Sequence, residues 1–596
     1  MGEVDEALVG ALEELRESLS ELRFPLATPA RESGTDGAAD TVAQLSDYVI
    51  PRLRNVSAPL IAVVGGSTGS GKSTIVNSLV GEVVTRSSAL RPTTRQPVLI
   101  HAVGEEQWFT PERVFPGLAR VAEARSAEAN SAHPGSAQPA PAEASSFAAP
   151  ATNELRMVGS SALPSGLAIV DSPDIDSVVA DNRQLAAQLL AAADLWIFVT
   201  TAARYADAIP WAMLDDARER HVVLAVVLNR VPAGVAQEIR PDLARELENH
   251  GLGSAPLFVI GEGPGPVDQL PSGDIEPLRG WLHGLASDAQ ARASVARQTL
   301  EGTLASILNR KDFILHAYTE QLAQEQALRD SAHAGVEQAL GSLAEALADG
   351  QLLRGEVLRR WQEIVGTGDF MRKLESGVAS VRDRISSWLR GKEQPTGEAE
   401  VAEAIEDSLQ AVLVAGATGM ISRIRADFER TPSGAGLATA AWGRLRPADQ
   451  REEAAGRLVR DWQRATLEML RGEGESKRTT ARIAALGVNA VGVALMVVVF
   501  AQTAGLTGGE VAIAGGTAVV AQRVLEAIFG DDAVRRMAKN ARTDLLERAR
   551  DFFLTDAGAF LAEVDRLGIS EQYLDGAGAA FDNAWRALRE GEVAWR

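Results

Sequence analysis

The chain has 596 residues, of which 46% are apolar, so it is long enough and apolar enough to build more than one domain with a buried core. Its formal net charge of −21 and its pI of about 5.0 argue against nucleic acid as the main partner and against general electrostatic attraction to anionic lipid. The absence of cysteine excludes disulfides and thiolate metal sites, and the seven histidines have no recognisable metal-binding spacing.

Residues 1–55 are expected to form helices that precede the main domain. Leu and Val recur at helical spacing over residues 4–23, and a second helix is predicted from about Asp40 to Leu53. Residues 1–25 are acidic and lack the basic and apolar regions of a signal peptide. We expect these N-terminal helices to pack on the stalk or neck that later helices form.

Residues 56–284 have the pattern of an α/β domain, in which apolar strand-like segments alternate with helical ones. The predicted strands are 60–64, 97–103, 167–170, 195–199, 222–228 and 257–260. This alternation predicts a mostly parallel sheet. Residues 124–152 consist mainly of Ala, Ser and Pro, which predicts a disordered insertion between two strands.

The C-terminal half has helical periodicity throughout. Residues 285–482 predict an elongated all-α bundle or stalk, and residues 527–596 predict helices that return to the stalk or neck. No internal repeat is evident in this region.

Residues 483–526 form an apolar segment, which we expect to be a helical hairpin. Its first arm, Ile483–Ala504, contains 22 residues without a charge and as a helix would measure roughly 33 Å, about the thickness of a bilayer's hydrocarbon core. The second arm, Val511–Gln522, is too short to span a bilayer alone. Two interpretations remain open: a membrane paddle that contacts lipid through residues 483–522, or a hairpin buried in the core of the bundle.

The segment from Gly66 to Ser73 reads GSTGSGKS, a complete phosphate-binding loop (P-loop) of the form G-x-x-x-x-G-K-[ST]. An apolar run before it predicts a buried strand, and TIVNSLVG after it predicts a helix. The loop's N–H groups and the positive helix end would face phosphate oxygens, Lys72 would reach the β- and γ-phosphates, and Ser73 would ligate Mg²⁺. The predicted nucleotide-binding residues here are Gly66, Ser67, Thr68, Gly69, Ser70, Gly71, Lys72, Ser73 and Thr74.

Two later motifs have the positions expected of nucleotide switches. Thr93 and Thr94 lie about twenty residues after the P-loop lysine, where a mobile threonine would complete Mg²⁺ coordination, and Thr94 is favoured slightly. The strand LAIVD ends at Asp171, a candidate Mg²⁺ ligand, in the motif DSPD. Asp174 stands where the D-x-P-G pattern has glycine, so it would lie near the γ-phosphate and hydrolysis is expected to be slow or partner-dependent.

Base recognition is expected after a later strand, VVLAVVLN, where the motif reads NRVP. Asn229 and Arg230 would lie near the base, with Arg230 stacking on it. Pro232 replaces the aspartate that normally reads guanine, and Asp242 is not in register with it. GTP is therefore inferred from the switch layout, and ATP is not excluded.

Taken together, GSTGSGKS, RPTTRQP, DSPD and NR resemble the bacterial branch of the dynamin-like GTPase superfamily. The resemblance implies a P-loop GTPase domain followed by a helical stalk, with Mg²⁺ and GTP as ligands and with Lys72, Thr68 and Thr94 as candidate catalytic residues. It also implies a homo-oligomer or a pair with an unlike dynamin-like partner, and GTP-driven remodelling of a bilayer. Dynamins usually have a Gln-Ser pair where this chain has Thr68 and Gly69.

Three functions are therefore weighed. The first is a membrane-remodelling GTPase in the bacterial cytoplasm, held at the cytoplasmic face of the cell membrane as a peripheral or integral protein. The second is a soluble, nucleotide-gated regulator or scaffold with low turnover, and the third is an ATPase partner of a transport machine. Ser172 follows Asp171 where ABC-type ATPases have a catalytic glutamate, which argues against the third.

Overall fold

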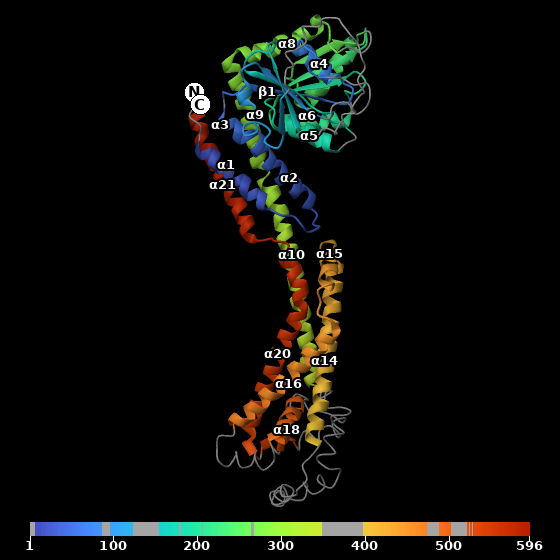
Figure 1. Ribbon diagram of the computed structural model, residues 1–596, viewed down its shortest axis with the longest axis vertical. Coiled ribbons are helices and arrows are strands. Elements are labelled where there is room, and N and C mark those ends of the chain that lie inside the picture. Colours follow the sequence, from blue (N-terminus) through green and yellow to red (C-terminus); the bar gives the residue numbers. More distant parts are fainter. Residues whose placement is uncertain are drawn as a thin grey trace, which may run out of the picture. The chain divides into compact units, whose positions relative to one another are not determined.

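The computed structural model describes residues 6–55, 57–85, 96–122, 154–177, 180–205, 207–263, 268–348, 397–473, 488–501 and 521–595, with positions 524 and 527 left out (Figure 1). The chain divides into two compact units. Unit 1 comprises Met1–Phe24, Ala30–Thr319 and Ser570–Arg596, and unit 2 comprises Pro25–Pro29 and Glu320–Ile569.

Unit 1 is built around an eight-stranded sheet of order β3-β4-β2-β5-β1-β6-β7-β8 (Figure 1). The strands are β1 (Leu60–Gly66), β2 (Val98–Ala102), β3 (Ala119–Ala122), β4 (Glu154–Ser160), β5 (Leu167–Asp171), β6 (Leu195–Thr201), β7 (Val223–Val231) and β8 (Leu257–Gly261). The pairing of β2 with β5 is antiparallel and every other pairing is parallel, which confirms the predicted mostly parallel sheet. Strands β3 and β4, on either side of the 124–152 segment, were not predicted. The segment itself lies outside the described residues.

The sheet is covered by helices on both faces, as its continuous apolar strands require. The helices of unit 1 are α1 (Glu6–Glu21), α2 (Arg31–Gln44), η1 (Leu45–Val49), α3 (Ile50–Arg54), α4 (Lys72–Val80), η2 (Glu106–Trp108), α5 (Ala180–Ala191), α6 (Ala208–Glu219), α7 (Ala236–Asn249), α8 (Ser272–Ser287), α9 (Ala289–Asn309) and α21 (Glu571–Trp595). All seven residues of β1 are buried. Leu60, Ala62 and Val64 share a core with α4 and α8, whereas Gly65 faces Leu190 of α5, because alternate residues of a strand point to opposite faces.

The N-terminal helices are joined to the sheet through a buried carboxylate. Asp194, fully buried just before β6, accepts hydrogen bonds from the Tyr48 hydroxyl at 3.0 Å and the Ile61 amide at 2.8 Å, and forms an ion pair with Arg52 at 3.1 Å. Tyr48 and Arg52 come from η1 and α3, and Ile61 from β1. Helix α1 packs against α21 from the far end of the chain.

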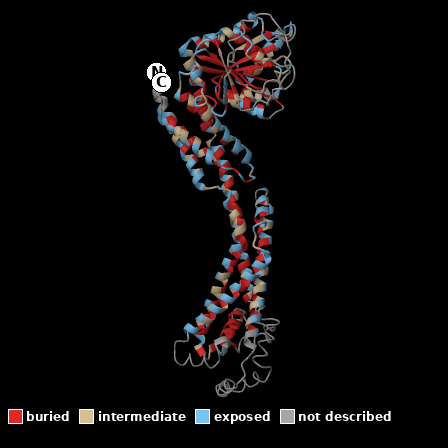
Figure 2. Cartoon of the chain, in the orientation of Figure 1, coloured by how far each residue is buried: buried red, intermediate tan, exposed pale blue. Residues whose placement is uncertain are grey.

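Unit 2 consists of packed helices. They are α14 (Gly397–Glu429), α15 (Pro432–Trp442), α16 (Ala448–Glu473), α18 (Val488–Ala501) and α20 (Asp531–Asp565), while α10 (Lys311–Ala348) contributes residues to both units. One continuous apolar core runs through these helices, visible as the red positions in Figure 2. The predicted helical bundle is thus confirmed for the described part of this region.

Helix α18 is the described part of the apolar segment 483–526. It packs against α14, α16 and α20, and from Val493 to Phe500 no side chain is more than 3% exposed. Within the described ranges, none of the helices combines the length and the apolar character needed to cross a bilayer. The predicted hairpin is therefore not shown: its first arm appears as a 14-residue helix inside the core, and most of its second arm lies outside the described residues.

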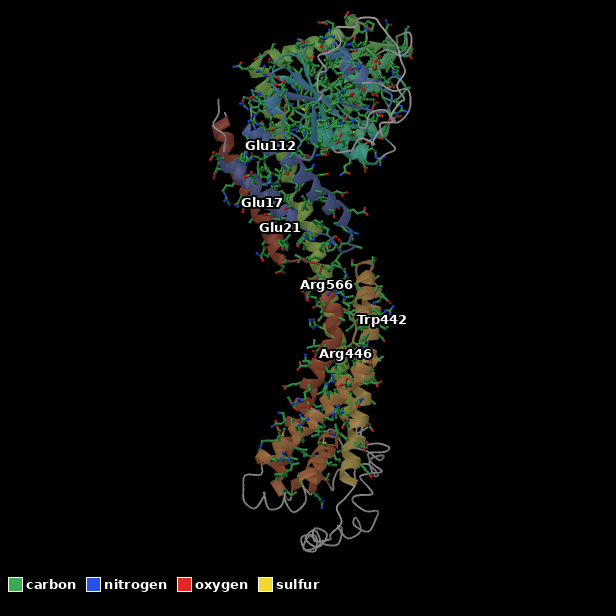
Figure 3. The ribbon with its side chains drawn as sticks, viewed as in Figure 1. Glu17, Glu21, Glu112, Trp442, Arg446 and Arg566 are labelled. Carbon is green, nitrogen blue, oxygen red and sulfur yellow. The ribbon has the colours of Figure 1, made fainter. Side chains whose placement is uncertain are left out.

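A buried ion cluster links α20 to α16 and to the loop that joins α15 to α16. The carboxylate of Asp556 is fully buried and accepts hydrogen bonds from Arg446 at 2.9 Å and Arg451 at 3.1 Å; Figure 3 labels Arg446 in this region. The Arg446 guanidinium also lies 4.8 Å from the centroid of the Phe552 ring. Among the described residues, Asp556 is the carboxylate paired with both arginines, and the site is largely buried.

We expect Asp556→Ala to destabilise unit 2 by about 3–5 kcal/mol, because it leaves two largely buried guanidinium groups without their counter-charge. Asp544→Ala, which removes a partly exposed pair with Arg548 on the same helix, is expected to cost less than about 1 kcal/mol. Chemical denaturation followed by circular dichroism measures both. Equal losses for the two variants would show that the buried cluster does not contribute as argued.

Candidate nucleotide-binding site

The P-loop connects β1 to α4 at the carboxyl edge of the sheet, as its motif predicts. Two of its glycines are required by close contacts. A β-carbon at Gly66 would lie 2.1 Å from the Val199 carbonyl oxygen, and one at Gly71, where φ is +93°, would lie 2.4 Å from the Asn229 side-chain nitrogen. No other residue type fits these positions without moving β6 or β7.

The Lys72 ammonium group is folded back over the loop in which it lies. It donates hydrogen bonds to the carbonyl oxygens of Gly66 at 2.8 Å and Ser67 at 3.2 Å, and to the Asp174 carboxylate at 2.5 Å. Its side chain is 6% exposed and that of Asp174 is 17% exposed. The carboxylate of Asp174, in the second-switch motif, is therefore hydrogen-bonded to Lys72, which the sequence predicts to bind phosphate.

Ser73 and Asp171, the predicted metal ligands, are in direct contact. The Ser73 hydroxyl donates to one Asp171 oxygen at 2.8 Å, and the two residues meet because Asp171 ends β5, the strand next to β1. Burial raises the pKa of the Asp171 carboxyl, and the Ser73 hydroxyl and Lys72 ammonium act in the opposite direction.

This pair fits a hard divalent cation. The second Asp171 oxygen, Oδ1, is buried and has no hydrogen-bond partner among the described residues. A serine hydroxyl and a carboxylate are oxygen ligands of the kind Mg²⁺ prefers, with the remaining positions left to water and phosphate. Thr93 and Thr94, the other predicted ligands, lie outside the described residues.

Asp176, which was not predicted, contacts the predicted residue Thr68. One Asp176 oxygen accepts from the Thr68 amide at 2.6 Å and from its hydroxyl at 2.7 Å, and the other accepts from Arg204 at 2.6 Å. Burial alone would raise the pKa of Asp176, but the Thr68 hydrogen bonds and the Arg204 charge outweigh it, so this pKa is lowered. Its only sequence signal was a third acidic residue in DSPDID.

The predicted base-side residues take two different positions. The Asn229 amide donates to the Ser70 carbonyl oxygen at 2.8 Å, so it orders the P-loop from β7. Arg230 is exposed and has φ of +52°, at a β-bulge where the pairing of β7 with β8 shifts. Asp242 accepts a hydrogen bond from the Tyr205 hydroxyl at 2.9 Å and is paired with Arg245.

The remaining P-loop residues complete the loop. Ser67, Ser70 and Thr74 are buried, and the Ser70 hydroxyl has no hydrogen-bond partner within the described part of the chain. Gly69 has φ of +77° with open space around it. The structure thus brings the P-loop, which follows β1, together with Asp171 and Asp174 from the end of β5 and with Asn229 from β7.

Asn229→Ala should weaken nucleotide binding about tenfold, because the loop loses the buried hydrogen bond that orders it, worth about 1–1.5 kcal/mol. Fluorescent-nucleotide titration measures the change. Asn249→Ala, at an exposed position of α7, is the matched control. An affinity within twofold of the unmodified protein would mean that the Asn229–Ser70 bond does not order the loop for binding.

Residues 61–231 match the family model described as Dynamin family, a range that contains the P-loop, Asp171 and Asn229. No curated protein matches the chain. Among solved structures, the chain is similar to two structures of an oligomerised bacterial dynamin pair, described as providing a mechanism for the long-range sensing and tethering of membranes.

The first of these structures is 11% identical, with a TM-score of 0.38 and coverage of 98% of this chain and 95% of that chain. The second is 10% identical, with a TM-score of 0.39 and coverage of 95% and 96%. A third, described as LeoA, a bacterial dynamin GTPase from ETEC, is 12% identical with a TM-score of 0.22 and coverage of 100% of both chains.

The family match rests on the same segment that contains the strand, loop and helix of the phosphate site. It agrees with the resemblance drawn from the motifs. Residues 61–231 of this chain therefore form a domain that matches the dynamin family.

Proposed function

We propose that this protein binds Mg²⁺·GTP at the P-loop, hydrolyses it, and uses this cycle to act on a lipid bilayer at the cytoplasmic face of a bacterial membrane. The nucleotide part rests on one observation above all: Lys72, Ser73 and Asp171 converge at the end of β1, in a domain of the dynamin family. Assembly with a second copy or an unlike dynamin-like partner belongs to the same proposal.

Each residue has a defined role in this proposal. The loop N–H groups and Lys72 bind the β- and γ-phosphates once the nucleotide has displaced Asp174. Ser73 and Asp171 would hold Mg²⁺, which supplies neutralisation of phosphate charge. Asn229 keeps the loop in shape, and Thr94 is proposed to sense the γ-phosphate.

The membrane part rests on α18 and its sequence surroundings. Residues 483–509 contain no charged side chain, and every residue of α18 except Asn489 is apolar or glycine. A helix of this kind is stable either in a protein core or in lipid. We propose that α18 is stored in the core of unit 2 and contacts the bilayer when the nucleotide cycle releases it.

A reversible disulfide tests this proposal, because the chain has no cysteine of its own. A β-carbon at Gly492 of α18 would lie 3.4 Å from Cγ of Leu467 on α16, so cysteines at the two positions can reach bonding distance. The variant Leu467→Cys/Gly492→Cys is mixed with phosphatidylglycerol–phosphatidylethanolamine liposomes and a non-hydrolysable GTP analogue. We expect it to pellet with liposomes when reduced and to stay in the supernatant when oxidised.

Leu467→Cys alone is the matched control, because it forms no intramolecular disulfide and should pellet under both conditions. Pelleting of the oxidised double variant would show that α18 need not leave the core. Absence of pelleting in every nucleotide state would reject the membrane part and leave GTP binding untouched.

The second candidate function is a soluble, nucleotide-gated regulator, and the burial of α18 favours it. In that case α18 is permanent core, and GTP binding changes only protein partners. The ATPase alternative gains no support: Ser172, in the place of the catalytic glutamate, is buried and donates its hydroxyl to the Val64 carbonyl oxygen at 2.8 Å.

A further inference from the structure

We propose that Arg204 is a catalytic residue that neutralises charge on the terminal phosphate of bound GTP. Until nucleotide binds, the Asp176 carboxylate occupies the position of that phosphate. This inference rests on the GTPase activity proposed above and adds a residue to it. Neither Arg204 nor Asp176 belongs to the motifs that predicted the site.

The Asp176 carboxylate lies where a phosphate oxygen is expected. It accepts from the backbone amide of Thr68, one of the loop N–H groups that P-loops direct at phosphate, at 2.6 Å, and from the Thr68 hydroxyl at 2.7 Å. Its other oxygen accepts from Arg204 Nη1 at 2.6 Å. Arg204 is therefore separated from the phosphate-binding amide by the width of one carboxyl group.

The fold holds Arg204 at this edge of the sheet. Strand β6 lies beside β1, with Val199 opposite Gly66, so the turn after β6 emerges next to the P-loop. The Arg204 amide donates to the Thr201 carbonyl oxygen at 3.0 Å, which fixes the backbone of that turn. The side chain is 38% exposed, so it can turn toward a new anion without disrupting the core.

Charge explains why the exchange occurs. The described residues of the site bring three carboxylates, Asp171, Asp174 and Asp176, against two cations, Lys72 and Arg204. A triphosphate cannot enter beside all three carboxylates, so it must displace Asp174 and Asp176. The two cations that these carboxylates release are then the groups that face the phosphates.

Arg204 acts on the chemical step itself. A water oxygen bonds to the γ-phosphorus, the bond from that phosphorus to the β–γ bridging oxygen breaks, and the products are GDP, inorganic phosphate and the proton that the water loses. Negative charge builds up on the phosphate oxygens during this transfer, and a guanidinium group placed there increases the rate by about 10³–10⁵-fold in GTPases.

The test compares hydrolysis with binding in Arg204→Ala and Arg204→Lys. We expect Arg204→Ala to lower kcat at least about 100-fold while GDP affinity changes less than threefold, because GDP lacks the γ-phosphate. The increase in GDP affinity caused by aluminium fluoride, a mimic of the transferred phosphoryl group, should be lost. Arg204→Lys should recover part of the rate, and Arg218→Ala, an exposed arginine at the other end of α6, should behave as the unmodified protein does.

Asp176→Asn gives an independent measurement. It removes the negative charge that competes with phosphate, so GTP should bind about tenfold more tightly. If Arg204 served only to hold Asp176, Arg204→Ala would also tighten GTP binding and leave kcat unchanged, and that result would overturn the proposal.

Failure of the proposed GTPase activity can be distinguished from failure of this inference alone. If the unmodified protein hydrolyses no GTP, the proposed GTPase function fails and this inference with it. If the unmodified protein hydrolyses GTP and Arg204→Ala does so within threefold, only this inference fails. Thermal unfolding checks that Arg204→Ala folds, and Arg204→Gln, which keeps the size and polarity of the side chain, takes its place if it does not.

Discussion

Lys72→Ala is expected to abolish nucleotide binding, with a loss of affinity of about 1000-fold. Truncating one partner of a buried, hydrogen-bonded charge pair costs about 2–5 kcal/mol, and every 1.4 kcal/mol is a factor of ten. Lys72 is 6% exposed and lies inside the loop that would surround the phosphates. In the alanine variant, water could not compensate the phosphate charge as the buried ammonium group does.

A second effect acts in the same direction. Lys72 donates a hydrogen bond to the Asp174 carboxylate and neutralises it, and removing the lysine would leave that carboxylate uncompensated where the γ-phosphate is expected. Repulsion between the two anions adds to the lost attraction. The Lys72 variant is therefore expected to bind less tightly than loss of one hydrogen bond alone would predict.

Titration with fluorescent GTP and ATP measures this effect and also decides between the two nucleotides. The chain has six lysines, so a control is easily chosen: Lys539→Ala, at an exposed position of α20, should bind as the unmodified protein does. If Lys72→Ala binds either nucleotide within threefold of the unmodified protein, the P-loop assignment is wrong.

The double substitution Val497→Asp/Val498→Asp is expected to unfold unit 2. Each valine is 1% exposed and belongs to the core shared by α14, α16, α18 and α20. An unpaired carboxylate in such a place costs several kcal/mol, and whole domains have only about 5–15 kcal/mol of stability. Loss of helical circular dichroism and rapid proteolysis of unit 2 are the expected observations.

The control for this variant introduces the same two charges on the surface. Thr418→Asp/Ser422→Asp places them one turn apart at exposed positions of α14, where like charges cost only a few tenths of a kcal/mol. A folded Val497/Val498 variant would show that α18 is not part of the core. Because unfolding is expected, loss of liposome binding in this variant would say nothing about membrane contact, whereas the disulfide keeps unit 2 folded.

The fold of unit 1 was largely predictable because its signals are local. Six strands are mainly apolar runs, and the P-loop motif is a contiguous segment that is recognisable without its tertiary contacts. Strands β3 and β4 escaped prediction because they lack such runs; β3 is the edge strand of the sheet and β4 lies next to it. β3 has only four residues, and most of β4 is half-buried.

The rest of the site could not be predicted, because it depends on residues that only the fold brings together. The contact between Thr68, Asp176 and Arg204 joins three segments, and no spacing in the sequence links them. For α18 the sequence could not predict the environment of the helix. A helix with apolar residues on every face is stable in a protein core and in a bilayer, so its composition does not distinguish the two.

Asp194 gives the nucleotide-binding domain a fixed end. Its carboxylate and backbone are bonded to Ile61, near the start of β1, and β6 begins at the next residue. The opposite ends of these two strands carry the P-loop and the turn of Arg204. Because both strands are anchored to one buried carboxylate, they cannot slide past each other when phosphate arrives. If nucleotide replaces Asp174 and Asp176 as proposed, the resulting movement is confined to the loops beyond the strands, and we expect those loops to transmit it to the rest of the protein.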